Sequence, residues 1–174
     1  GDVYKRQGLF KKTIPLDVIV GDELAFGIND GMRMVGDDQE GKMIFYNPNS
    51  IGRGFHISWD EDEKSELNLR LLNPTTTDEM RSFFNCLRRI TSYWKCSVTI
   101  DGIEEDIDDY LSQEDDLLAF NHRVIKEVSE KIVNGETDSL TLMSTMWPLV
   151  IGKDEAEQFI LNPHLFSSWM HELQ

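Results

Sequence analysis

Basic residues are scarce in this chain. Its 174 residues include 17 lysines and arginines against 32 aspartates and glutamates, so the formal net charge at pH 7 is −15. Proteins that bind DNA or RNA gain most of their affinity by neutralising phosphates with basic side chains, and anionic membranes attract the same side chains. The charge therefore argues against nucleic-acid and membrane partners, whereas it suits a basic protein as a partner.

Long hydrophobic runs and recognisable catalytic motifs are also lacking. No stretch approaches the roughly twenty apolar residues that a membrane span needs, and no signal-peptide pattern is present. The two cysteines and four histidines show no metal-ligand spacing, and no phosphate-loop, dinucleotide or nucleophile-elbow motif occurs. We therefore predict a cytoplasmic protein with no metal and no cofactor, and we favour a non-enzymatic role. No oligomeric state follows from the sequence.

The first seven residues, Gly1 to Gln7, resemble a cloning scar followed by a translated sequencing adapter. We expect them to be foreign to the natural protein, whose own N-terminus would then be longer. The alternative is a genuine short strand over Val3 to Phe10. Because 40% of the residues are hydrophobic, the rest of the chain, residues 8–174, can bury a core, and we predict one domain there.

Alternating and helical patterns together predict an α+β fold. Hydrophobic residues alternate with polar ones over Gly54–Trp59 and over Leu67–Leu72, which predicts a central hairpin whose polar face holds His56, Ser58, Asn68 and Arg70. We expect a mainly antiparallel sheet, covered by a C-terminal helix and by two long amphipathic helices, Thr77 to Lys95 and Glu114 to Val133. Thr13 to Val20 is predicted as a strand, and Ser139 to Ile151 as one strand interrupted near Pro148 or as two.

Two stretches of the chain are the run Ile51-Gly52-Arg53-Gly54-Phe55-His56-Ile57-Ser58-Trp59 and, after it, Asn73-Pro74-Thr75-Thr76. Together they resemble an uncharacterised bacterial family, a domain of unknown function of the Firmicutes. In that family a Gly-Arg-Gly-Phe element enters a hairpin, which is followed by a Pro-Thr turn and a helix. The resemblance extends over Ile51 to Lys95. It implies a cytoplasmic bacterial protein with an α+β fold, and it carries no catalytic residue and no ligand.

The candidate anion-binding site in the sequence consists of Gly52, Arg53, Gly54 and His56. Backbone amides beside two glycines and a guanidinium can bind a phosphate or a carboxylate. The alternative interpretation is structural: the glycines allow a bend into the hairpin, and Arg53 pairs with a nearby acid.

A second candidate site is an acidic stretch without lysine or arginine. It includes Glu104, Glu105, Asp108, Asp109, Asp115 and Asp116. The stretch lacks the ligand spacing of a calcium-binding loop, so a docking face for a basic partner is the stronger functional interpretation. The alternative is a solvated surface that maintains solubility.

From the sequence we predict a non-enzymatic, acidic protein-interaction module. The alternative function is a hydrolase or an enzyme that binds a small molecule or anion beside the Gly-Arg-Gly hairpin, with Arg53 and His56 in its site.

Overall fold

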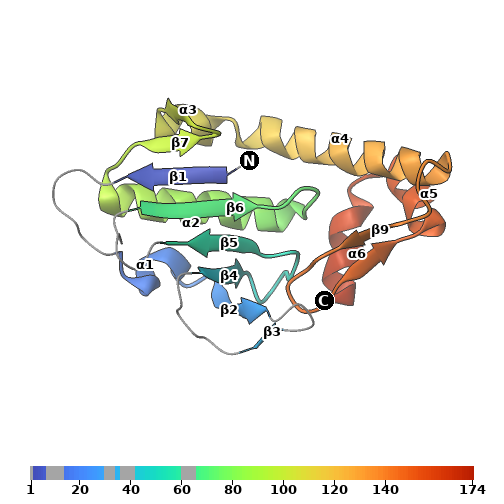
Figure 1. Ribbon diagram of the computed structural model, residues 1–174, viewed down its shortest axis with the longest axis horizontal. Helices are drawn as coiled ribbons and strands as arrows, with labels where there is room; N and C mark the ends of the chain where they lie inside the picture. The colour runs from blue at the N-terminus through green and yellow to red at the C-terminus, as the bar shows by residue number, and fades with distance from the viewer. Residues whose placement is uncertain (1, 7–13, 30–33, 36–41, 60–65) are drawn as a thin grey trace.

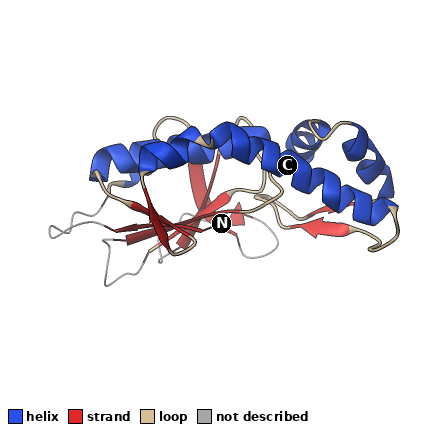
Figure 2. Ribbon diagram, turned by 90° about the horizontal axis from the view of Figure 1, so that it is seen from above, coloured by secondary structure: helices blue, strands red, loops and turns tan. Residues whose placement is uncertain are grey.

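An eight-stranded antiparallel sheet carries helices on one face (Figures 1 and 2). The computed structural model describes residues 2–6, 14–29, 34–35, 42–59 and 66–174. Along the sheet the strands are β3 (Met34–Val35), β2 (Ala25–Asn29), β4 (Lys42–Tyr46), β5 (Phe55–Ser58), β6 (Glu66–Leu71), β1 (Asp2–Arg6), β7 (Val98–Ile100) and β8 (Ile103–Glu105). Every pairing in this sheet is antiparallel. The predicted α+β fold is confirmed.

The central hairpin is formed by β5 and β6, as predicted. Phe55 pairs with Leu71 and Ile57 with Leu69, whereas His56 pairs with Arg70 on the opposite face. Strand β1 lies between β6 and β7, and it consists of residues that the sequence suggests are foreign to the protein. The origin of these residues stays a prediction.

Helix α2 (Thr77–Trp94) buries an apolar stripe on the sheet, and it ends one residue before the predicted C-terminus at Lys95. The Thr76 side chain accepts a hydrogen bond from the Glu79 amide at 3.1 Å, which caps the helix. Helix α1 (Leu16–Val20) packs beside α2, with Ile19 in the same core. The predicted strand over Thr13 to Val20 is wrong for the described part of that range, because Leu16–Val20 forms a helix that follows Pro15.

A second hydrophobic core lies beside the main one. Helix α3 (Ile107–Ser112) leads into α4 (Glu114–Val133), which begins over the main core and continues over the C-terminal part of the chain (Figure 2). There the hairpin of β9 (Leu140–Leu142) and β10 (Leu149–Ile151) packs with α5 (Lys153–Leu161) and α6 (Leu165–Leu173). The interruption predicted near Pro148 therefore separates two strands. None of the described helices is both long enough and apolar enough to cross a membrane.

The segment Ile51–Gly54 joins the two cores. The Gly52 carbonyl accepts a hydrogen bond from the Thr145 amide at 3.1 Å, and Arg53 Nε donates to the Met143 carbonyl at 2.9 Å. On the other side, His171 Nδ1 lies 2.8 Å from the Ile51 carbonyl. These contacts connect the entrance of β5 to the β9–β10 connection and to α6.

The carboxylate of Glu79 lies beneath this segment, and only 3% of the residue is exposed. It accepts hydrogen bonds from the amides of Arg53 and Gly54 and from the Thr75 hydroxyl. Burial raises the pKa of the Glu79 carboxyl, while these hydrogen bonds and the charge of Arg53 oppose that rise. A Cβ at Gly52 would lie 2.9 Å from Glu79 Oε1, so the glycine allows the carboxylate to approach the backbone.

We predict that Glu79→Gln lowers the free energy of unfolding by about 2 kcal/mol, because a glutamine turns an amide toward donors that now bond to a carboxylate. Urea denaturation followed by circular dichroism measures the change. Glu157→Gln, an exposed substitution on α5 with the same charge change, should alter stability by less than about 0.5 kcal/mol. Equal midpoints for wild type and Glu79→Gln would contradict this role of Glu79.

Candidate functional site

A pocket of about 330 Å³ opens on the face of the sheet opposite α2, and we call it the basic pocket. Its lining residues are Lys42, Ile44, Arg53, His56, Arg70, Leu72, Met143 and Ser144. They come from β4, β5 and β6, from the residue after β6, from the segment before β5, and from the connection after β9. The basic pocket therefore depends on both cores.

The strand register explains why these side chains meet. Ile44 of β4 pairs with His56 of β5, which pairs with Arg70 of β6, so the three side chains form one row across the sheet. Lys42 lies two residues before Ile44 and shares its face, because side chains alternate along a strand. The row faces away from α2, since the neighbouring residues of each strand fill the main core.

Positive charge is concentrated in the basic pocket. Lys42, Arg53 and Arg70 contribute three cationic groups, and none of the described lining residues is an acid. The whole chain nevertheless carries a net charge of −15. A cleft lined by charges of one sign raises the local concentration of counter-ions.

Arg53 is held in place by backbone carbonyls. Its Nε donates to Met143 at 2.9 Å, and its Nη1 donates to the Pro74 carbonyl at 3.1 Å. Among the described residues, none accepts a hydrogen bond from Nη2. Burial lowers the pKa of the Arg53 guanidinium, whereas Glu79 acts to raise it. A guanidinium fixed in this way presents its remaining donors in a defined direction.

His56 lies half-buried among these cations. Burial lowers the pKa of His56 most strongly, and the positive charges of Lys42, Arg70 and Arg53 lower it further, so that together they bring it to about 4. The imidazole is therefore neutral at pH 7, where it can offer one donor and one acceptor to a ligand.

The structure brings two of the predicted anion-site residues, Arg53 and His56, into the basic pocket. The backbone of the bend has another role: the amides of Arg53 and Gly54 donate to Glu79, so the anion at this bend is a carboxylate of the chain itself. Gly54 has a φ of +72°, and a Cβ there would lie 2.5 Å from Ile44 Cγ2. Alternation along the sequence already predicts that Arg70 and His56 share a face, whereas Lys42 has no predicted role because its pairing partner, Ser58, is distant in the sequence.

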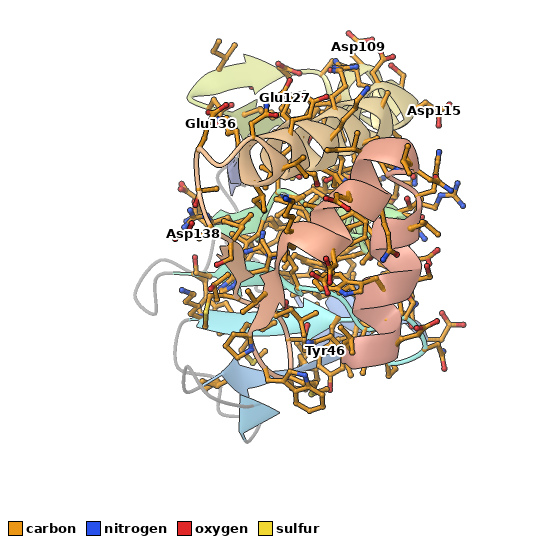
Figure 3. The ribbon with its side chains drawn as sticks, turned by 90° about the vertical axis from the view of Figure 1, so that its right-hand side faces the viewer. Tyr46, Asp109, Asp115, Glu127, Glu136 and Asp138 are labelled. Atoms are coloured by element: carbon orange, nitrogen blue, oxygen red, sulfur yellow. The ribbon has the colours of Figure 1, made fainter. Side chains whose placement is uncertain are left out.

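The predicted docking residues lie on three consecutive elements, and we call them the acidic surface. Glu104 and Glu105 belong to β8, Asp108 and Asp109 to α3, and Asp115 and Asp116 to the first turn of α4. All are exposed except Glu105, which is half-buried. Figure 3 shows the side chains of Asp109 and Asp115 pointing away from the body of the protein. The surface is only partly helical, because Ile103–Glu105 pairs with β7 as a strand.

No group of three or more histidine, cysteine, aspartate or glutamate side chains is placed to hold a metal ion in the part of the chain that the structure describes. The rings of His122 and His164 contact each other, with their centroids 4.2 Å apart. His171 instead bridges the Ile51 carbonyl and Asp78, whose Oδ2 lies 3.2 Å from Nε2.

The comparisons with known proteins identify a family. No curated protein and no solved structure matches the chain. The model of a family described as a domain of unknown function, DUF4299, matches residues 2–174, which is nearly the whole sequence. This match agrees with the family resemblance found over Ile51 to Lys95. The chain belongs to the DUF4299 family, whose domain has an unknown function.

Proposed function

We propose that this domain binds a small anionic ligand in the basic pocket. The observation that carries the proposal is the convergence of Lys42, Arg53 and Arg70 around one cavity, without an acid among its described lining residues. Charge-assisted hydrogen bonds from such groups are the usual means of holding a phosphate or a carboxylate. The neutral imidazole of His56 adds one more donor.

The size and lining of the basic pocket favour an organic anion over a bare oxyanion. About 330 Å³ lies within the range of small-molecule sites. Ile44, Leu72 and Met143 supply apolar surface beside the cations. We therefore propose an organic phosphate or carboxylate as ligand, with its anionic group among the cations and its carbon skeleton against these three side chains.

The proposal is for binding and not for catalysis. A hydrolase at the same place would use His56 as a general base, and a base works best when its pKa is near the working pH. An imidazole with a pKa of about 4 is a weak base at neutral pH. The chemistry of His56 thus suits a ligand contact better than proton abstraction.

Anion binding should depend on pH through His56. A bound anion offsets the cations that lower the pKa of His56, so this pKa is higher in the complex than in the free protein. Between the two pKa values binding takes up a proton, and sulfate affinity should rise as the pH falls from 6.5 toward 4, by at most about tenfold per unit. Isothermal titration with sulfate at several pH values measures this trend.

The matched variants for this experiment are His56→Gln and His122→Gln. The first should lose the pH dependence while keeping some affinity, and the second should keep it, because His122 lies on α4 outside the basic pocket. Identical pH profiles for wild type and His56→Gln would overturn the assignment of His56 to the site.

Lys42 offers a test that leaves the fold intact. We expect Lys42→Gln to raise the dissociation constant for sulfate roughly fivefold, because an exposed charge contact contributes about 1 kcal/mol. Stability should change by less than about 0.5 kcal/mol, since the side chain is exposed. Lys126→Gln, an exposed substitution on α4, is the control with the same charge change. Equal losses in the two variants would show that only net charge matters.

A second candidate function, from the sequence, is docking of a basic protein partner on the acidic surface. The observation that favours it is that these carboxylates come from three elements and are nearly all exposed, so a partner can reach them. Complementary charge accelerates association and fixes orientation.

We also propose that the protein acts in the bacterial cytoplasm, which its low cysteine content supports.

Charge neutralisation tests the docking function. A fourfold variant replaces four acids of this surface by their amides: Glu104, Glu105, Asp108 and Asp109. It should lose a partner that the wild-type protein retains from a bacterial lysate at low salt. The control variant neutralises four exposed acids at and beyond the far half of α4, Glu127, Glu130, Glu136 and Asp138. A partner bound equally by both variants would contradict docking on the acidic surface.

A further inference from the structure

A second cavity, of about 220 Å³, lies between α2, the β7–β8 hairpin and the α3–α4 connection. We call it the aromatic pocket, after its lining residues Phe83, Phe84, Tyr110 and Phe120. Two acids, Asp101 and Glu105, also line it. The pocket thus combines aromatic rings with negative charge, and it adjoins the acidic surface through Glu105.

The aromatic side chains are held in place by each other. Phe84 stacks on Tyr110 with their ring centroids 5.5 Å apart, and Phe83 meets Phe84 edge to face at 6.0 Å. Phe83 and Phe84 are buried in the main core, whereas Phe120 is 45% exposed. The rings therefore form a preformed lining with one side open to an incoming group.

The two acids come from a tight turn and the strand after it. Asp101 and Gly102 connect β7 to β8, and both have positive φ values, 49° and 84°. This turn pairs Val98 with Glu105 at the base of the hairpin. Burial, followed by the charges of Glu105 and Asp101, raises the pKa of the Tyr110 hydroxyl to about 12. With two acids and no lysine or arginine among its described lining residues, the aromatic pocket favours a cation.

We propose that the aromatic pocket receives an arginine side chain of a basic protein partner. The aliphatic stem would pack on the rings, and the guanidinium would meet Asp101 and Glu105 while it stacks on an aromatic face. The chain itself places arginines on these rings: Arg88 Cζ lies 6.0 Å from the Phe84 centroid and Arg123 Cζ 5.7 Å from that of Phe120. Neither arginine lines the pocket.

The neighbouring surface suits a protein as the source of this arginine. Ile103, beside Gly102 in the same hairpin, is 67% exposed and offers an apolar contact outside the pocket. Glu104 and Asp108 add exposed negative charge around it. A buried anchor surrounded by a charged rim is the usual anatomy of a protein interface. This inference rests on the proposed docking function for its partner, whereas the pocket can be tested alone.

The test uses N-acetyl-arginine amide as probe and N-acetyl-citrulline amide as its neutral isostere. In a ¹H–¹⁵N NMR titration the arginine probe should shift the amide signals of Gly102, Glu105 and Gln113 and should bind at least about fivefold more tightly than the citrulline probe. Equal binding of the two probes, or shifts elsewhere only, would overturn the proposal.

A charge-matched pair of variants locates the binding. Asp101→Asn with Glu105→Gln should weaken the arginine probe at least about fivefold, and asparagine tolerates the positive φ at this turn. Glu136→Gln with Asp138→Asn removes the same charge near the end of α4, well away from Asp109 in Figure 3, and should leave binding unchanged. Equal weakening in the two pairs would contradict a specific pocket.

The probe and the lysate experiment separate the two claims. If the arginine probe binds as expected but no salt-sensitive partner is lost on neutralising the acidic surface, the pocket stands and the docking function fails. If such a partner is lost while the probe does not bind in the pocket, the docking function stands and the arginine anchor is wrong.

Discussion

The arrangement of both cores depends on the buried carboxylate of Glu79. This single group accepts hydrogen bonds from the amides of Arg53 and Gly54 and from the Thr75 hydroxyl, so it fixes the chain entering β5 against the start of α2. A buried carboxylate without hydrogen-bond donors would destabilise the folded protein, so Glu79 needs the amides that the bend at Gly52 and Gly54 presents. The bend in turn needs Glu79, because its buried amides would otherwise lack an acceptor. From this fixed segment Arg53 reaches the Met143 carbonyl and so connects the sheet to the C-terminal core.

The same junction creates the basic pocket. Two carbonyls hold Arg53 in the cavity that Ile44, His56 and Arg70 also line, and the connection after β9 lines another part of it. The structural and functional interpretations of the Gly-Arg-Gly element are therefore compatible. Its amides serve the fold by binding an internal carboxylate, while its side chain faces a cavity whose described lining includes three basic residues and no acid.

Local patterns predicted the parts of the molecule that local interactions determine. Period-two alternation identified the β5–β6 hairpin and placed His56 and Arg70 on one face, and amphipathic helical spacing identified α2. Leu16–Val20 was misassigned because β-branched residues there favour a strand, whereas packing against α2 selects a helix. Lys42 and Met143 could not be assigned to the site, since their positions depend on the β4–β5 pairing and on the docking of the C-terminal core, both of which are long-range contacts.

Opposite charges are thus separated on one acidic chain, with cations in the basic pocket and carboxylates on the acidic surface. The most direct test of the central claim is anomalous diffraction from crystals soaked in selenate, a heavier equivalent of sulfate. The account predicts an ordered selenate within hydrogen-bond distance of Lys42 and of the Arg53 or Arg70 guanidinium. An empty basic pocket at saturating selenate, with peaks only at other places, would contradict it.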